Sequence, residues 1–353
     1  GTSERTASQI ASTVDFWAGS LDGFSGKNSF GVSGKFLSKD LFGGLDLLAN
    51  VAFEPTFPAS EMEKVREDIL AGIRAKKDRP MPQLFDLFYK TLFRKHPYGH
   101  PQTGTEESIK SITRSGLKEW HAAHAIPQHF VLAIVGDVNA DQIIPYINSL
   151  FGKFGSPQKD LSDIPPEAPL IAPRQVHLER PGAQTHIVIG YLGASIKSKE
   201  NAPMALIETA LSGQGGRLFT RLRDKSSLAY SVTAFRRPGL ETGVFGVYLA
   251  CDPSKLSTAK DALFRELYEI REEGLAENEL EEAKRYLLGN LKIQRQTSGS
   301  QAMHMALDEL YGLGYDHIRQ FIRDIEALDL EDIKQAAQKI IVPERDAFVT
   351  VGP

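Results

Sequence analysis

Residues 109–136 read IKSITRSGLKEWHAAHAIPQHFVLAIVG, and residues 325–352 repeat the pattern as IEALDLEDIKQAAQKIIVPERDAFVTVG. Apolar residues, a lysine, a proline and the closing glycine recur at positions that differ by 216, without a gap. Solenoid repeats have much shorter periods, of roughly 20–50 residues. The two stretches therefore predict a duplicated domain rather than a solenoid.

The duplication extends upstream and is incomplete in the first copy. Phe30–Val32 corresponds to Phe245–Val247 at an offset of 215 residues. The second copy begins near Val176, which aligns with a position about 40 residues before Gly1. We therefore expect the first copy to lack its opening strand and helix, and we expect its open sheet edge to be filled by another segment or chain.

A change of composition separates the two copies. Residues 155–174 read GSPQKDLSDIPPEAPLIAPR, which is rich in proline, serine and aspartate and has no apolar period. We interpret residues 157–174 as a linker between a first domain over residues 1–156 and a second domain over residues 175–353. The length of 353 residues also favours at least two domains.

Strand patterns come before helix patterns in both copies. Alternating apolar residues predict strands over residues 28–37 in the first copy and over 186–192, 229–237 and 243–251 in the second. Helical periodicity predicts helices over residues 40–53, 60–77 and 81–93 in the first copy and over 256–273, 277–294 and 301–311 in the second. A further helix and an apolar strand close each domain, and in the first copy this strand is expected at residues 130–135. The order predicts an α+β fold, with helices covering one face of a mainly antiparallel sheet in each domain.

Composition and charge exclude several classes of protein. Apolar residues make up 41% of the chain and charged residues 24%, which is ordinary for a soluble globular protein. The net charge is −4 and the lysines and arginines are scattered, so no basic face for nucleic acid is expected. No apolar run is long enough to span a bilayer. Cys251 is the only cysteine, which excludes an internal disulfide.

Several histidines and carboxylates lie close together in the sequence, but their spacing does not indicate a metal site. His121 and His124 are three residues apart, whereas zinc-binding helices more often use a spacing of four. His96 and His100 flank prolines and a glycine, which is typical of a rigid turn. We therefore favour structural roles for these histidines. An acidic run at a helix start is expected to be a solvated face, because carboxylates favour the positive end of the helix dipole. This run comprises Glu272, Glu273, Glu277, Glu279, Glu281 and Glu282.

The most informative stretch is residues 215–232, GGRLFTRLRDKSSLAYSV, in which a helical pattern leads directly into a strand. Leu218, Phe219 and Leu222 are expected on the buried side of this helix. The stretch resembles the GG-SRLF–LR–LAYSV signature of the M16 metallopeptidases, the family of insulinase, pitrilysin and mitochondrial processing peptidase. Other landmarks of that family occur in its order along the chain: Gly1-Thr2, Pro55-Thr56-Phe57, Asp78-Arg79-Pro80, His96-Pro97-Tyr98-Gly99, Gly104-Thr105 and Val135-Gly136-Asp137-Val138.

The resemblance also implies where a zinc site would be. Members of that family hold zinc through an HxxEH helix and a later glutamate, and the glutamate of the motif activates a bound water. The HxxEH helix would lie before Gly1. The later glutamate stands six residues before the aspartate of an E-I-x-x-x-x-D-x-P pattern, where this chain has Gly72 before Asp78. Glycine offers no side-chain ligand, so the resemblance implies that this chain is the non-zinc-binding half of such an enzyme. It then implies no cofactor in this chain and zinc in a partner half.

Arg223 and Tyr230 match the arginine and tyrosine that the non-zinc half of such enzymes extends toward a bound peptide. A guanidinium and a phenol donate hydrogen bonds to peptide carbonyls and can stabilise charge that develops on the scissile oxygen. From residue types alone, Arg223 as a surface cation and Tyr230 as strand core is the simpler interpretation. The resemblance assigns both residues to substrate binding.

Taken with the resemblance, these residues imply the inactive, substrate-clamping half of a zinc metallopeptidase. It would process or degrade peptides when paired with a zinc-bearing half, either in the same polypeptide or as a separate subunit. A homodimer is a further assembly compatible with the family. The alternative function is that of a non-proteolytic, structural M16-like subunit of a larger complex. By itself the chain is expected to be inactive, and the resemblance alone favours a bacterial periplasmic or envelope location.

Overall fold

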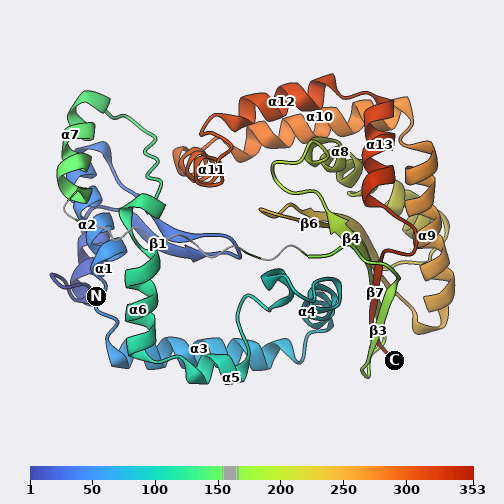
Figure 1. Ribbon diagram of the computed structural model, residues 1–353, viewed down its shortest axis with the longest axis horizontal. Coiled ribbons are helices and arrows are strands. Elements are labelled where there is room, and N and C mark those ends of the chain that lie inside the picture. Colours follow the sequence, from blue (N-terminus) through green and yellow to red (C-terminus); the bar gives the residue numbers. More distant parts are fainter. Residues whose placement is uncertain (153, 155–163, 165–166) are drawn as a thin grey trace. The chain divides into compact units, whose positions relative to one another are not determined.

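The computed structural model describes residues 1–152, 154, 164 and 167–353 (Figure 1). Contacts divide the described residues into two compact units. Unit 1 contains Gly1–Ile73, the described part of Gln102–Ser162, and Gln294–His317. Unit 2 contains Arg74–Pro101, the described part of Asp163–Ile293, and Ile318–Pro353.

This division into units does not test the predicted linker and domain limits. Of the linker expected over residues 157–174, residues 157–163 and 165–166 lie outside the described residues. The repeat groups segments by sequence similarity, whereas the two units group them by contact. The limits 1–156 and 175–353 therefore stay a prediction.

Unit 1 is mainly helical. Its elements are α1 (Ala7–Phe16), β1 (Ser20–Ser25), β2 (Phe30–Lys35), η1 (Ser38–Asp40), α2 (Leu41–Phe53), most of α3 (Ala59–Lys76), α5 (Glu106–Ser111), α6 (Arg114–His124), η3 (Pro127–His129), α7 (Ala140–Phe151) and α11 (Ser298–Leu310). Four of its described helices begin after threonines whose hydroxyls accept a hydrogen bond from the third helical N–H, namely Thr6, Thr105, Thr113 and Thr297. Such caps satisfy backbone donors that the helix itself leaves unpaired.

The sheet of unit 1 has two antiparallel strands in the part of the chain that the structure describes. β2 is the strand predicted over residues 28–37, and it pairs with β1, which the sequence did not reveal. The register places Ser20 opposite Lys35 and Ser25 opposite Phe30. A two-stranded sheet has little independent stability, and α2 and α11 pack against β2.

The strand predicted over residues 130–135 is wrong, since the structure has no strand there. Its counterpart β7 (Ala347–Gly352) lies between two neighbouring strands, which supply its hydrogen bonds. Residues 130–135 have no such neighbours among the described residues of unit 1. Phe130 instead packs against other aromatic rings, with centroids 4.8 Å from Phe53 and 6.4 Å from Phe30. An apolar sequence alone therefore does not make a strand without a partner.

Unit 2 holds the larger sheet. Its helices are α4 (Pro80–Leu92), α8 (Asn201–Leu211), α9 (Leu256–Glu273), almost all of α10 (Glu277–Gln294) and α12 (His317–Ala327), and α13 (Leu330–Ile340). Its short helices are η2 (Pro97–Gly99), η4 (Phe219–Lys225) and η5 (Pro253–Lys255). Its strands are β3 (Arg174–Glu179), β4 (Thr185–Gly193), β5 (Ser231–Arg237), β6 (Gly243–Cys251) and β7. The strands predicted over residues 186–192, 229–237 and 243–251 are thus confirmed as β4, β5 and β6.

The five strands are ordered β3-β7-β4-β6-β5. Of the strand pairs that the described residues form in this sheet, β3–β7 is parallel and the others are antiparallel. The α+β fold with a mainly antiparallel sheet is therefore confirmed. Within the described residues, no helix has the length and apolar character needed to cross a membrane.

Helices cover both faces of this sheet, whereas the sequence suggested one (Figure 1). Ile187 and Ile189 of β4 belong to a core shared with α8, α9 and α13. Val188, between them, belongs to a second core that contains Leu84 and Phe88 of α4. The reason is that successive side chains of a strand point to opposite faces, and those of β4 and β6 are apolar on both.

Candidate functional site

The segment from α8 to β5 carries the predicted clamp residues. It leaves α8 through Gly213, whose φ of +80° lies in the left-handed region that glycine tolerates. The helix expected next is a seven-residue π-helix, η4. Ser227 then turns the chain with a φ of +49°, and β5 follows. Left-handed backbone at a residue other than glycine, next to a π-helix, marks a locally strained segment.

Apolar side chains hold η4 on the protein core. Leu218 and Leu222 are buried, as the sequence predicted, whereas Phe219 is half-buried. The N–H of Leu228 donates to the carbonyl oxygen of Leu222 at 2.8 Å. This bond closes the turn that leads to Tyr230.

Arg223 and Tyr230 both lie at the surface. The guanidinium of Arg223 lies over the ring of Phe219, 4.8 Å from its centroid. Tyr230 is 54% exposed, and its backbone N–H donates to the carbonyl oxygen of Ala250 at 2.8 Å. Among the described residues, neither side chain makes a hydrogen bond or an ion pair. Two exposed donor groups on one anchored segment are thus available to a ligand, whereas a strand-core tyrosine would be buried.

Two arginines tie this segment to the helices beside it. The buried Arg217 pairs with Glu279 of α10, with Nε at 2.8 Å from Oε1, and Arg221 pairs with Glu266 and Glu269 of α9. Burial raises the pKa of Glu266 and outweighs the lowering by Arg221. Burial alone would also raise the pKa of Glu279, but the bonds from Arg217 and a backbone N–H outweigh it and lower that pKa.

The sequence did not reveal this group of carboxylates. Glu279 belongs to the acidic run that was expected to be a solvated face, and for Glu279 that expectation is wrong because Arg217 and the N–H of Ala276 bind it. The signal available in the sequence was the pair of arginines at a spacing of four, which places Arg217 and Arg221 on one helical face.

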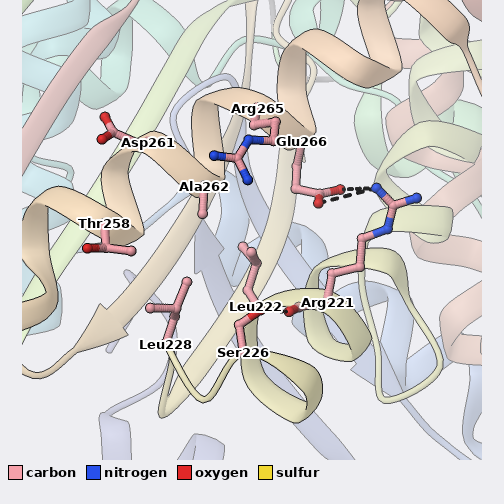
Figure 2. Close-up of a pocket in the computed structure, with 9 residues that line it drawn as sticks. All are labelled: Arg221, Leu222, Ser226, Leu228, Thr258, Asp261, Ala262, Arg265 and Glu266. Carbon is pink, nitrogen blue, oxygen red and sulfur yellow. Dashed lines mark hydrogen bonds and ion pairs between the residues drawn. The ribbon is translucent and has the colours of Figure 1, made fainter.

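A small pocket of about 250 Å³ lies between η4 and α9 (Figure 2). It is lined by Arg221, Leu222, Ser226, Leu228, Thr258, Asp261, Ala262, Arg265 and Glu266. Its charges are two arginines and two carboxylates, and the leucines and the alanine supply apolar surface. Figure 2 shows the guanidinium of Arg221 directed at the carboxylate of Glu266.

The described residues do not fit a zinc site at the position that the family pattern implies. Gly72 lies on α3, and a Cβ built there would meet no atom within 4 Å. Asp68, one turn earlier on the same helix and not considered from the sequence, is exposed. No group of three or more histidine, cysteine, aspartate or glutamate side chains that could hold a metal occurs in the described residues.

The other candidate histidines have structural contacts. A ring nitrogen of His121 lies 2.8 Å from the carbonyl oxygen of Ala52, and the ring of His124 stacks on Trp120. His96 is buried, and its Nδ1 accepts a hydrogen bond from the backbone N–H of Tyr98. These contacts agree with the structural roles favoured from the sequence.

Comparison with protein families decides the class of the chain. The model for the peptidase M16 inactive domain matches residues 111–287, and the model for insulinase (peptidase family M16) matches residues 1–106. The chain belongs to peptidase family M16. Within that family, residues 111–287 are of the inactive-domain type.

Curated relatives of this M16 chain carry the words zinc protease in their names. An uncharacterized zinc protease of Mycobacterium leprae is 28% identical over 360 residues, which cover all of this chain and 80% of that protein. An uncharacterized zinc protease of Bacillus subtilis is 23% identical over 354 residues, which cover all of this chain and 85% of that protein.

Solved structures of similar fold cover the whole M16 chain. The peptidase M16 inactive domain from Pseudomonas fluorescens superposes with a TM-score of 0.88 at 23% identity, covering all of this chain and 85% of that one. A protease from Helicobacter pylori gives a TM-score of 0.87 at 18% identity, covering all of this chain and 87% of that one. At these identities, the likeness shows the shared fold alone.

Proposed function

We propose that this M16 chain is the substrate-clamping half of a zinc metallopeptidase, and that it acts on peptides when a zinc-bearing half is present. The observation that carries the proposal is the exposure of Arg223 and Tyr230 on one anchored segment, where neither side chain forms a hydrogen bond or an ion pair within the described residues. Zinc, in the other half, would supply the activated water. This chain would supply hydrogen bonds that hold the peptide.

The chemistry of the two side chains fits this role. A guanidinium always carries its charge and donates up to five hydrogen bonds, and a phenol donates one. Aimed at peptide carbonyls, they orient the substrate, and a donor that meets the scissile oxygen is worth most when negative charge develops there. Both groups recognise backbone, so they do not by themselves select a sequence.

A structural M16-like subunit is the second candidate function. The group of ion pairs around Arg217 and Arg221 would also suit a scaffold, because it stabilises the fold irrespective of substrate. The exposure of Tyr230 favours the clamp, since a scaffold gains nothing from an unpartnered phenol at the surface.

The test measures peptide cleavage with the zinc-bearing half in excess. Arg223→Ala and Tyr230→Phe should each lower kcat about ten- to a hundred-fold, because a lost hydrogen bond to developing charge costs roughly 1.5–3 kcal/mol and each 1.36 kcal/mol is tenfold. Thermal melts should stay close to those of the unmodified chain, because both side chains are exposed.

Matched controls remove exposed groups of the same two chemical kinds. Lys225→Ala removes another exposed cation of η4, and Tyr286→Phe removes another exposed phenol; both should leave kcat within about twofold. If the clamp variants cleave peptide as well as these controls, Arg223 and Tyr230 are surface residues without a role. If no cleavage occurs with any zinc-bearing half, the scaffold is the better description.

A further inference from the structure

We propose that Arg221 is a positioning residue of the clamp: its ion pairs with Glu266 and Glu269 hold η4 in the geometry that presents Arg223 and Tyr230. The inference rests on the proposed function in its last step only. Its first step, that Arg221 fixes the shape of this segment, is independent of any activity.

The segment needs such support because its backbone is intrinsically unfavourable. π-Helical turns are rare and usually brief, and η4 extends over seven residues. It ends at Lys225, two residues before Ser227, whose backbone is left-handed although the residue is not glycine. Such conformations persist only where contacts with the surrounding structure hold them in place.

Arg221, on η4, provides that support by binding two carboxylates of α9. Its Nη1 lies 3.1 and 3.3 Å from the two carboxylate oxygens of Glu266, and 2.7 and 2.8 Å from those of Glu269. The two carboxylates are three residues apart and therefore lie on one face of α9. Leu263 and Leu267 of the same helix are fully buried and fix α9 in the core. One guanidinium thus joins the strained segment to a well-packed helix.

Arg221 cannot itself be the residue that meets the peptide. Arg221 faces α9 and the pocket of Figure 2. Residues two apart project from roughly opposite sides of a helix, so we expect Arg223 to project away from that pocket. Arg223 rests on Phe219 instead. The two arginines thus differ in their partners: two carboxylates bind Arg221, whereas Arg223 forms no ion pair within the described residues.

Hydrogen bonds along the turn connect Arg221 to Tyr230. The hydroxyl of Ser226 donates to the carbonyl oxygen of Arg221 at 2.6 Å, and the N–H of Ser227 donates to that of Arg223 at 3.1 Å. The N–H of Tyr230 then joins the sheet through Ala250. Loss of the ion pairs between Arg221 and α9 should therefore destabilise the turn up to the hydrogen bond between Tyr230 and Ala250.

The experiment compares Arg221→Met, Arg221→Lys and Arg265→Met in the full chain by amide hydrogen exchange. Arg265 is the control because it lies on α9, lines the same pocket and forms no ion pair among the described residues. Arg221→Met should speed exchange of the amides of residues 227–230 at least tenfold, while β4 and β6 stay protected. Arg221→Lys, which keeps the charge, should restore part of the protection, and Arg265→Met should change nothing. Unchanged exchange at residues 227–230 in Arg221→Met would overturn the proposal.

Kinetics with the zinc-bearing half then test the link to the clamp. Arg221→Met should lower kcat about tenfold, but it should lower it less than twofold in a chain that already carries both Arg223→Ala and Tyr230→Phe, because no clamp group is then left to position. Full, multiplicative losses in that background would overturn the role of Arg221 in placing the clamp. If Arg223→Ala alone leaves kcat unchanged, the proposed function fails, and the exchange data still decide whether Arg221 holds the segment.

Discussion

The carboxylate of Glu167 joins two segments of the chain by accepting hydrogen bonds from backbone N–H groups. Glu167 is 9% exposed, and one of its carboxylate oxygens accepts from the N–H groups of Arg94, Lys95 and His96 at 2.8–3.0 Å. It fastens the chain that enters unit 2 to the turn that follows α4. Burial by itself raises the pKa of Glu167, but these donors and Arg174 outweigh burial and lower that pKa below its ordinary value.

The sign of this shift fixes a pH dependence. Because the pKa is lower in the folded chain than in the unfolded one, ionised Glu167 stabilises the fold above the ordinary glutamate pKa of about 4.3. That contribution is lost as the pH falls through the lower, folded pKa. At pH 7, Glu167→Gln should therefore reduce the free energy of unfolding by about 1–2 kcal/mol, since charge-assisted hydrogen bonds are the stronger ones.

Urea unfolding at a series of pH values measures this difference. The curves for the unmodified chain and Glu167→Gln should converge at acidic pH, where the carboxyl is protonated in both states. Glu179→Gln is the control, because Glu179 is exposed and without a partner in the described residues, and it should lie within about 0.5 kcal/mol at pH 7. A difference for Glu167→Gln that is the same at every pH would contradict the argument.

At the scale of elements, the packing of α4 on the sheet depends on one glycine. A Cβ at Gly190 of β4 would lie 2.4 Å from the ring of Phe88 on α4 and 3.1 Å from the carbonyl oxygen of Phe245. Phe88 is fully buried in the core on this face. The glycine thus lets the helix approach the sheet closely, which a larger residue would prevent.

Gly190→Ala should therefore reduce the free energy of unfolding by about 1–3 kcal/mol, the usual effect of overpacking a core. Gly72→Ala is the matched substitution, because Gly72 lies in a helix with open space around it. It should instead stabilise the chain by about 0.5–1 kcal/mol, as alanine does in exposed helices. Urea unfolding of both variants measures whether the two changes in the free energy of unfolding have opposite signs. Destabilisation by Gly72→Ala would contradict the open space around Gly72.

At the scale of the whole molecule, the absence of a ligand at Gly72 has a measurable consequence. We expect the purified chain to hold much less than one zinc ion per molecule and to cleave no peptide without a zinc-bearing half. Gly72→Glu should not change either result, because a single carboxylate is not a zinc site without nitrogen or sulfur ligands near it.

Metal analysis after gel filtration, beside a quenched-peptide assay, measures both quantities. The control is the zinc-bearing half alone, which should hold its metal under the same conditions. One tightly held zinc per chain, in either the unmodified protein or Gly72→Glu, would contradict the assignment of this chain to the non-zinc half.

Local sequence patterns predicted most of the long helices and strands, the family and the candidate residues. Periodicity located β4, β6 and α9 to within a residue or two, because each buries a continuous apolar face. The signature around Arg223 and Tyr230 placed the chain in its family, and the glycine at position 72 excluded a glutamate ligand there.

Tertiary structure decided what depends on neighbours distant in sequence. Residues 130–135 have the apolar pattern of β7 but no strands to pair with, so the same kind of sequence forms a strand in one copy only. The second face of the larger sheet is covered by α4, which the sequence could not reveal because the contact joins residues about 100 positions apart. The partners of Arg217 and Arg221 likewise lie 45–62 residues away, on α9 and α10. Hydrogen bonds and ion pairs require a partner at a fixed distance, and only the folded chain supplies it.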